Sequence, residues 1–264
     1  MHTATMMAEL RRALDPLRGR RSIAFVPTMG AFHDGHVALF HAAQRECDTV
    51  VVSLFVNPAQ FGDPADLAAY PRDAARDEAI AREAGVDVLF APAAEEMYPP
   101  GFATWVDVEG AAVGLEGEHR PGHFRGVATV CLKLFTMVAP DVVFMGQKDA
   151  QQVAVVQQVV RDLNVPVAVR VVPTVRDADG LALSSRNARL SAEERARALA
   201  IPRALDAGLA AHRSGADPVT AAREALGGLD TEYVAVADFS GRPTLAIAAR
   251  VGRTRLIDNV RLEE

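Results

Sequence analysis

Residues 22–46, SIAFVPTMGAFHDGHVALFHAAQRE, constrain the fold of this chain more than any other stretch. The apolar run 23–26 predicts a buried strand, Pro27 ends it, and Gly30 marks a turn. From His36 onward the apolar spacing predicts a helix. A strand, a tight loop and a helix N-terminus form a natural anion site, because the N–H groups of the first helical turn point at the ligand. This stretch therefore predicts a nucleotide-binding βα unit.

Two histidines, His33 and His36, bring imidazoles to this loop in the pattern H-x-G-H. Each ring can donate a hydrogen bond to a phosphate oxygen, and donors aimed at developing negative charge are a strong catalytic device. Gly35 leaves room for the backbone to approach a phosphate closely. A lone histidine here would be interpreted as an ordinary helix-entry residue. Two at this spacing, after a strand and P-T-M-G, favour a nucleotide site.

Strands and helices alternate through the first 187 residues at the spacing of βαβ units, which predicts an α/β fold with a doubly wound, Rossmann-like parallel sheet. The Pro- and Gly-rich stretch 91–122 is expected to be irregular, with a short strand around 104–108. The other expected strands are 49–56, 86–90, 142–145 and 167–172, and the expected helices are 5–20, 72–84, 124–138 and 149–163.

The pattern changes after Asn187, where helices are followed by strands. Ser191 begins an S-x-x-E capping box, and we expect helices at 191–212 and 217–226. Strands are expected at 232–238, 245–249 and 253–259. The sequence therefore predicts two domains, a Rossmann-like domain over 1–187 and a smaller C-terminal α+β domain over 188–264.

The amino-acid composition argues against several classes of protein. A formal charge of −6 at pH 7 argues against a general nucleic-acid-binding protein, which needs basic faces. The chain has no run of 18 apolar residues, and its first 20 residues mix acids and bases, so we expect no membrane span, no secretory signal and a cytoplasmic location. Cys47 and Cys131 are expected to be free thiols rather than disulfide or metal ligands.

Three further stretches place polar residues at predicted strand ends. Asn57 and Gln60 follow one strand, and Lys148 and Asp149 follow another, where a lysine can neutralise a phosphate and an aspartate can bind ribose or cap a helix. Residues 172–187, VPTVRDADGLALSSRN, combine a D-G turn with two serines and an arginine, which suits a phosphate-gripping loop. Each motif taken alone also occurs in ordinary turns and caps.

Together these motifs resemble the pantothenate synthetase (pantoate–β-alanine ligase) family of H-x-G-H nucleotidyltransferases. The resemblance rests on PTMGAFHDGH, NPAQF at 57–61, YPRD at 70–73, FMGQKDAQQ at 144–152 and LSSRN at 183–187. Phe32, Ala150 and Leu183 stand where the family usually has leucine, tyrosine and methionine. The resemblance implies condensation of pantoate with β-alanine through a pantoyl adenylate, with ATP as a substrate, Mg²⁺, small-molecule partners only and a homodimeric assembly.

The resemblance also assigns residues. It implies catalytic roles for His33, His36, Lys148 and Arg186, and binding of pantoate and β-alanine by Gln60, Gln152 and Asn57. It implies ATP binding by Pro27, Thr28, Met29, Gly30, His33, His36, Gly146, Lys148, Asp149, Val175, Leu183, Ser184, Ser185 and Arg186. Asp77 is a candidate for holding Mg²⁺, with a solvated helix charge as the alternative. Residues 188–264 would form a lid domain over ATP and pantoate bound by residues 1–187.

Two other interpretations stay open from the sequence. The chain could be a different adenylate-forming or cytidylyl-transferring H-x-G-H enzyme, or a non-catalytic nucleotide-sensing domain. The scarcity of basic faces counts against a tRNA ligase, and the complete histidine, lysine and arginine set counts against a domain that has lost catalysis.

Overall fold

The computed structural model describes residues 1–239 and 241–263. These residues form two compact units. Unit 1 consists of Met1–Gly146 and Val155–Val172, and unit 2 consists of Gln147–Ala154 and Pro173–Glu264. The expected boundary between residues 187 and 188 stays a prediction.

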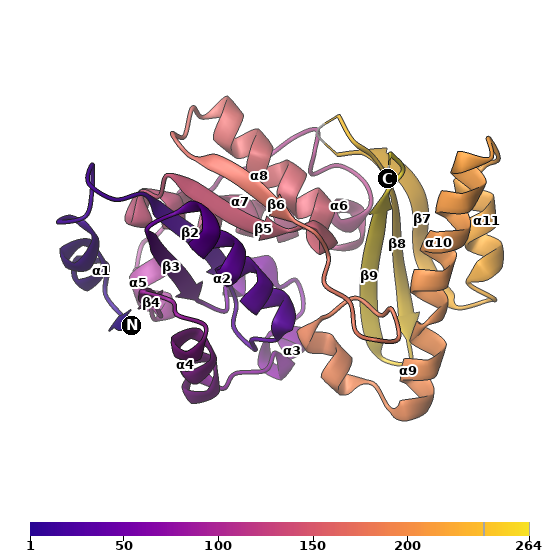
Figure 1. Cartoon of the computed structure of the whole chain (residues 1–264), viewed down its shortest axis with the longest axis horizontal. Coiled ribbons are helices and arrows are strands. Elements are labelled where there is room, and N and C mark those ends of the chain that lie inside the picture. Colours follow the sequence, from indigo (N-terminus) through magenta and orange to yellow (C-terminus); the bar gives the residue numbers. More distant parts are fainter. Residues whose placement is uncertain (240, 264) are drawn as a thin grey trace. The chain divides into compact units, whose positions relative to one another are not determined.

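Unit 1 is built on a six-stranded sheet in the order β1-β4-β3-β2-β5-β6, in which all neighbouring strands run parallel (Figure 1). From β2 the chain passes to β3 and β4 on one side, and later to β5 and β6 on the other. The doubly wound parallel sheet predicted from the sequence is therefore confirmed. In such sheets ligands bind beside the carboxyl ends of the strands where the order reverses, which here is the end of β2. The strands are β1 (His2–Ala4), β2 (Ile23–Thr28), β3 (Thr49–Leu54), β4 (Val88–Phe90), β5 (Val142–Gly146) and β6 (Ala168–Val172).

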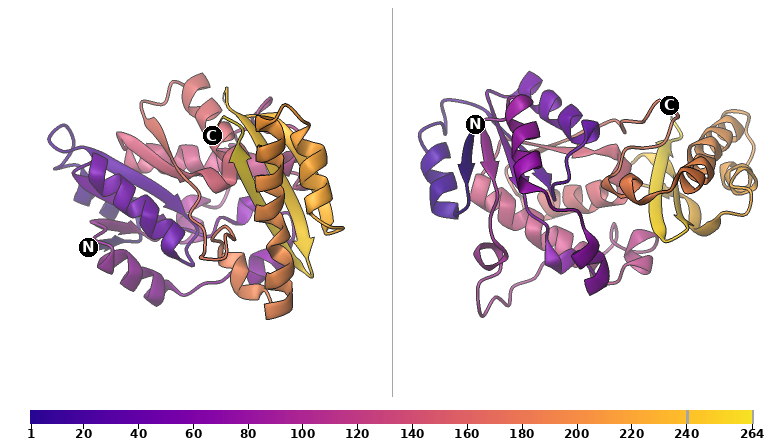
Figure 2. Two further views of the ribbon diagram at one scale, coloured as in Figure 1. Left: turned by 45° about the vertical axis from the view of Figure 1, so that its right-hand side comes forward. Right: turned by 90° about the horizontal axis from the view of Figure 1, so that it is seen from below.

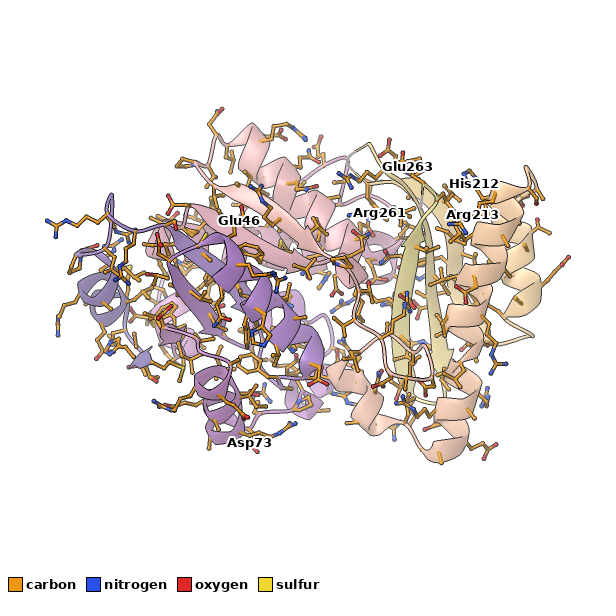
Figure 3. The ribbon with its side chains drawn as sticks, in the orientation of Figure 1. Glu46, Asp73, His212, Arg213, Arg261 and Glu263 are labelled. Atoms are coloured by element: carbon orange, nitrogen blue, oxygen red, sulfur yellow. The ribbon has the colours of Figure 1, made fainter. Side chains whose placement is uncertain are left out.

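Helices cover both faces of this sheet. Along β2, Ala24 and Val26 share a buried cluster with Phe40 of α2 (Asp34–Glu46), which lies along the sheet in Figures 1 and 2. Phe25 points to the opposite face, where it meets Phe135 of α7 (His123–Val138) edge to face at 6.3 Å. At the end of α2, Glu46 forms a 2.8 Å ion pair with Arg170 of β6 (Figure 3).

The remaining helices of unit 1 are shorter or lie at its edges. They are α1 (Met7–Leu14), η1 (Pro58–Gln60), α3 (Pro64–Ala69), α4 (Ala74–Glu83), α5 (Ala94–Met97) and α6 (Glu116–His119). Helix α8 (Ala150–Asp162) belongs to unit 2 up to residue 154 and to unit 1 beyond it.

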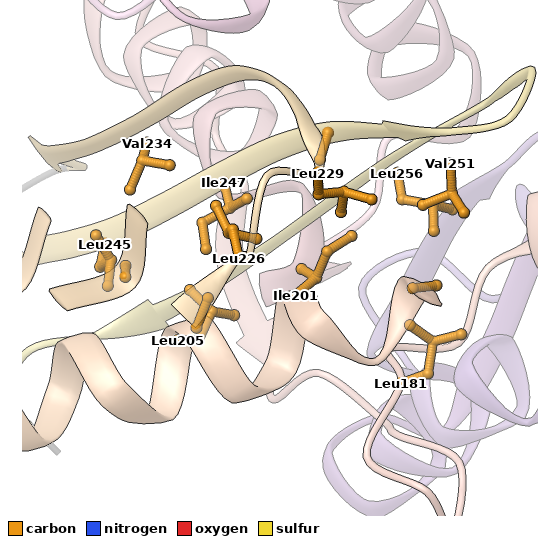
Figure 4. Packing of buried hydrophobic residues seen from close by; sticks show 14 of the residues in the cluster. Leu181, Ile201, Leu205, Leu226, Leu229, Val234, Leu245, Ile247, Val251 and Leu256 are labelled. Carbon is orange, nitrogen blue, oxygen red and sulfur yellow. The ribbon is translucent and has the colours of Figure 1, made fainter. Parts of the chain in front are cut away.

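Unit 2 contains an antiparallel sheet in the order β7-β8-β9, as expected for the smaller α+β part. The middle strand β8 is buried along most of its length, and its Leu245 and Ile247 share a cluster with Ile201 and Leu205 of α10 (Figure 4). Helices α10 and α11 lie on the same face of this sheet (Figure 2). The elements are η2 (Gln147–Asp149), η3 (Ser185–Arg189), α9 (Ala192–Ala198), α10 (Ala200–Arg213), α11 (Pro218–Ala225), β7 (Asp230–Asp238), β8 (Pro243–Val251) and β9 (Thr254–Arg261).

Three local expectations are wrong for identifiable reasons. The helix expected over 191–212 breaks at Leu199, because Pro202 has no N–H to donate to the carbonyl four residues earlier. No strand forms over 104–108 in the described chain, since the Val106 N–H bonds to the Thr129 side chain instead of a neighbouring strand. The helix expected over 5–20 covers only Met7–Leu14, and the short edge strand β1 precedes it.

Two other expectations are confirmed, the Ser191 capping box and the free thiols. The Ser191 capping box forms, with Ser191 and Glu194 each accepting from the other's backbone N–H. Cys47 and Cys131 are free, and burial raises the pKa of the Cys131 thiol to about 12. Among the described residues, no helix has the length and apolar character needed to cross a membrane.

Candidate active site

The H-x-G-H segment lies where β2 passes into α2. His33 caps the helix, because its Nδ1 accepts a 3.1 Å hydrogen bond from the Gly35 N–H, and His36 Nδ1 accepts from the His33 N–H at 3.2 Å. The two ring centroids lie 4.2 Å apart. Since each Nδ1 accepts a backbone N–H, the neutral rings carry their proton on Nε2. Both imidazoles can therefore donate a hydrogen bond through Nε2 at the N-terminus of α2, which is the positive end of the helix dipole.

Asp77 holds the loop that precedes these histidines. Its side chain extends from α4 and is 1% exposed, and its two oxygens accept the N–H groups of Ala31 at 2.8 Å and Phe32 at 2.7 Å. Ala31 has a φ of 53°, a conformation that costs a non-glycine residue about 1–2 kcal/mol. Gly30 has a φ of 83°, and a Cβ there would lie 2.7 Å from Asp77 Oδ2. The alternative that Asp77 is a solvated helix charge is therefore wrong.

Asn57 caps the one-turn helix η1, which follows β3, and Gln60 is the last residue of that helix. The Asn57 amide donates to Gln60 Oε1 and to the Gly126 carbonyl, both at 3.1 Å, and the hydroxyl of Tyr98 donates to Asn57 Oδ1 at 2.8 Å. Asn57 is 1% exposed, so it acts here as an internal support for Gln60. Desolvation by burial raises the pKa of Tyr98 to about 12, which keeps the phenol protonated and able to donate.

The start of α7 packs directly against η1. His123 donates through Nδ1 to the Gln60 carbonyl at 3.0 Å, and a Cβ at Gly126 would lie 2.7 Å from the Gln60 backbone nitrogen. The Gln60 side chain in turn contacts Met29 Sδ at 2.9 Å. The structure thus brings together Gln60 and Met29 from two predicted segments. No sequence pattern indicates the supporting roles of Tyr98 and His123, because neither residue follows a strand end.

In unit 2, Lys148 lies in the one-turn helix η2, with its Nζ 3.7 Å from Asp149 Oδ1. Asn259 of β9 is bonded to this turn, because its amide donates to the carbonyls of Gln147 at 3.0 Å and Lys148 at 2.8 Å. Arg261, labelled in Figure 3, also donates to the Gln147 side chain. No expectation from the sequence involved β9 in the site.

The segment 175–187 forms a short hairpin followed by η3. The Leu183 N–H donates to the Val175 carbonyl at 3.0 Å, so these two predicted ATP-binding residues are hydrogen-bonded neighbours. Ser184 caps η3 by accepting the Arg186 N–H at 3.2 Å. Asp258 of β9 accepts from both terminal nitrogens of Arg176, at 2.6 and 3.1 Å.

The pKa values of the two carboxylates Asp258 and Asp179, which hold this hairpin, shift in opposite directions. Desolvation by burial raises the pKa of Asp258, while the Arg176 guanidinium and the Asn259 N–H partly offset that effect. At the hairpin turn, the Leu181 N–H is the main cause that lowers the pKa of Asp179, and Arg195 adds to it. Arg195 also reaches Asp177 at 2.7 Å, so the turn between Val175 and Leu183 is held by ion pairs as well as by its backbone.

The described residues offer no metal cage. They contain no group of three or more histidine, cysteine, aspartate or glutamate side chains that could hold an ion. Both oxygens of Asp77 accept loop N–H groups, and this arrangement fits a structural carboxylate better than a metal ligand. The proposed Mg²⁺ role of Asp77 stays a prediction, and no chemical step below depends on it.

The comparisons with known proteins identify the family. The family model of pantoate–beta-alanine ligase matches residues 2–261. The chain belongs to the pantoate–beta-alanine ligase family. A pantothenate synthetase of Bradyrhizobium diazoefficiens is 51% identical, with 98% of each chain covered. The crystal structure of a Thermus thermophilus pantothenate synthetase superposes with a TM-score of 0.94 at 47% identity and 99% coverage of both chains.

A third relative of this family was solved with ligands. The pantoate–beta-alanine ligase of Francisella tularensis, in complex with beta-gamma ATP and beta-alanine, is 35% identical, with a TM-score of 0.88 over 100% of this chain and 98% of the other. These similarities bear out the α/β fold and the expected family. They make a different H-x-G-H activity or a nucleotide sensor the weaker interpretation.

The residues that the family resemblance implied are divided between the units. Unit 1 holds Pro27, Thr28, Met29, Gly30, His33, His36, Asn57, Gln60, Asp77 and Gly146, and unit 2 holds Lys148, Asp149, Gln152, Val175, Leu183, Ser184, Ser185 and Arg186. Each set is drawn from segments distant in sequence. The roles of the individual residues stay predictions.

Proposed function

We propose that this chain joins pantoate to β-alanine at the expense of ATP, giving pantothenate, AMP and pyrophosphate, a reaction of coenzyme A biosynthesis. In the first step a pantoate carboxylate oxygen attacks the α-phosphorus, a new P–O bond forms, and the bond to pyrophosphate breaks. In the second step the β-alanine amine attacks the acyl carbon of the pantoyl adenylate. A C–N bond forms, AMP leaves, and the amine loses a proton to solvent.

One observation carries this proposal: a family match over nearly the whole chain coincides with two imidazole Nε2 donors at the N-terminus of α2. Negative charge grows on the oxygens of the α-phosphate and on pyrophosphate during the first step. Preorganised donors aimed at that charge are worth about 10²–10³-fold in rate each. No covalent nucleophile on the protein is required.

We assign the other roles on the same basis. Lys148 and Arg186 supply positive charge to the phosphates, Lys as a point charge and Arg as a bidentate fork. Gln60 and Gln152 bind pantoate, because amides offer both donors and acceptors to hydroxyl and carboxylate groups. The internal support of Gln60 by Asn57 and His123 favours a fixed orientation of its amide.

The proposal also includes a metal ion, an oligomeric state and a cellular location. Since the described carboxylates form no cage, Mg²⁺ would be bound mainly by phosphate oxygens of ATP and water, as is usual for this ion. Its chemistry would be to neutralise charge on the outer phosphates. A homodimer and a cytoplasmic location are proposed on family membership, with small molecules as the only other partners.

The test is a reaction with the pure protein, ATP, Mg²⁺, pantoate and β-alanine. We expect pantothenate, AMP and pyrophosphate in equal amounts, and no product when any one substrate is left out. Labelled pyrophosphate should exchange into ATP with pantoate present and β-alanine absent. Stoichiometric ADP would contradict attack at the α-phosphorus, and nucleotide binding without turnover would favour a sensor.

A further inference from the structure

The turn that carries Lys148 has little stability of its own. Helix η2 spans only Gln147–Asp149, a single turn of 3₁₀ helix, in which hydrogen-bond geometry is poorer than in an α-helix. The Lys148 side chain is mostly buried, with 18% of it exposed. The position of its ammonium group therefore depends on whatever holds the η2 backbone.

Asn259 bonds to this turn through both polar atoms of its side chain. It is 5% exposed, and its amide donates to the carbonyls of Gln147 and Lys148 while its Oδ1 accepts from Gln147 Nε2 at 3.0 Å. An asparagine side chain has two donor hydrogens and one acceptor oxygen. Both the amide nitrogen and the oxygen of Asn259 are thus bonded to the two residues at and before Lys148.

The preceding residue of β9 holds a different segment. Asp258 binds both terminal nitrogens of Arg176, the residue after Val175. Successive side chains of a strand point to opposite faces, so Asp258 shares a face with Leu256, which packs in the cluster of unit 2. Asn259 shares the other face with Arg261, which also contacts Gln147. One dipeptide therefore reaches two segments that carry proposed ATP-binding residues.

We propose that Asn259 is a positioning residue for ATP chemistry, which sets the Lys148 ammonium through the η2 carbonyls. This inference rests on the proposed ATP role of Lys148. A group displaced by about 1 Å from its productive position can lose about 10²-fold in rate, so a support of this kind matters to catalysis.

A purely structural role for Asn259 predicts a different pattern. It would lower the thermal stability of the protein and weaken every ligand alike. A positioning role acts through one side chain, so its effect must disappear when that side chain is removed. A double-mutant cycle between Asn259 and Lys148 separates the two possibilities.

The experiment compares wild type, Asn259→Ala, Lys148→Ala and the double variant. Calorimetric titration with a non-hydrolysable ATP analogue and steady-state kinetics are run on each protein, together with thermal unfolding. We expect Asn259→Ala to lower kcat/KM for ATP by about 10–100-fold, with KM for pantoate little changed. In the Lys148→Ala background the same substitution should change both kcat/KM for ATP and the affinity for the analogue by less than about twofold. Multiplicative effects in the double variant would overturn the proposal.

Two further substitutions on β9 provide a second test of the inference and a control. Asn259→Asp keeps the acceptor for Gln147 Nε2 but replaces the donor with a second oxygen that faces two carbonyls, so it should be at least as impaired as Asn259→Ala. Thr254→Val, at an equally buried polar position on the same strand, should leave ATP affinity unchanged. An Asn259→Asp protein with normal ATP affinity would contradict positioning through the carbonyls.

The outcome is separable from that of the proposed function. If wild type makes no pantothenate but binds the ATP analogue through Lys148, the ligase assignment fails and the binding arm of the cycle still tests Asn259. If Lys148→Ala binds the analogue as tightly as wild type and keeps the wild-type kcat/KM for ATP, Lys148 has no ATP role and the inference about Asn259 falls with it.

Discussion

The carboxylate of Asp77 accepts a 2.7 Å hydrogen bond from the backbone N–H of Phe32, the residue before His33. Its second oxygen accepts from Ala31, whose φ of 53° lies in the left-handed region. One buried side chain of α4 therefore stabilises a strained loop. That loop ends at His33, a candidate catalytic residue. The loop enters α2 at His33, whose Nδ1 accepts from the Gly35 N–H and whose own N–H donates to His36 Nδ1.

Removing this carboxylate should affect stability and activity together. Asp77→Ala leaves the N–H groups of Ala31 and Phe32 without their acceptor, at a cost of about 1–3 kcal/mol each in the free energy of unfolding. We expect urea unfolding to show this loss and pyrophosphate exchange to fall about 100-fold as the loop relaxes. Asp63→Ala removes only the cap of α3 and should cost about 1 kcal/mol with normal exchange. A stable Asp77→Ala protein with normal exchange would refute this account.

His36→Ala tests the proposed donor directly. The His36 ring is half-buried and lies 5.3 Å from the Phe32 ring, but it is not part of the buried cluster that contains Phe32, so the protein should stay folded. Loss of one preorganised donor should lower the rate of pantoate-dependent pyrophosphate exchange by about 10²–10³-fold. His41→Ala, at an exposed position of the same helix, should have no effect. Full exchange activity in a folded His36→Ala protein would remove His36 from the transition state.

The sequence was informative wherever structure follows from local pattern. The alternation of apolar strands and helices predicted the parallel sheet, and H-x-G-H with its flanking strand predicted the β2–α2 loop. The break at Leu199 was also accessible, since Pro202 is visible in the sequence and cannot donate within a helix.

What the sequence could not reveal depends on contacts between distant residues. Asp77 meets Ala31 across 46 positions, and Asn259 meets Lys148 across 111. Nothing in the spacing around Asp77 distinguishes a buried loop support from a solvated helix charge, and Asn259 sits in an ordinary strand pattern. Their roles appear only once the fold brings the backbone N–H and C=O groups beside them.

Replacing glutamines should separate pantoate recognition from ATP recognition. Gln60→Ala and Gln152→Ala each leave polar groups of pantoate without partners, which costs about 1–3 kcal/mol of binding free energy. We expect pantoate affinity to fall strongly and ATP affinity little, whereas Lys148→Ala should do the reverse. Calorimetric titration of each ligand against each variant measures this. Equal loss of both affinities in the glutamine variants would contradict the assigned subsites.

The Tyr98 phenol gives a prediction about alkaline pH. Desolvation by burial raises its pKa to about 12, above the value of about 10 for an exposed tyrosine. The folded protein therefore binds the phenol proton more tightly than the unfolded chain does. This contribution to stability is complete below about pH 10 and is lost as the pH rises towards about 12.

The chain has three tyrosines, so the titration of Tyr98 can be isolated by difference. Near-ultraviolet absorbance of tyrosinate, recorded for wild type minus Tyr98→Phe, should show one phenol that ionises near pH 12 in the folded protein. The same substitution removes one of the two donors to Asn57 Oδ1, the other being the Ala59 N–H. Asn57 supports the amide of Gln60, so KM for pantoate should rise while KM for ATP stays near its wild-type value. A difference spectrum that titrates near pH 10 in protein still folded would show that Tyr98 is exposed to solvent and does not provide this support.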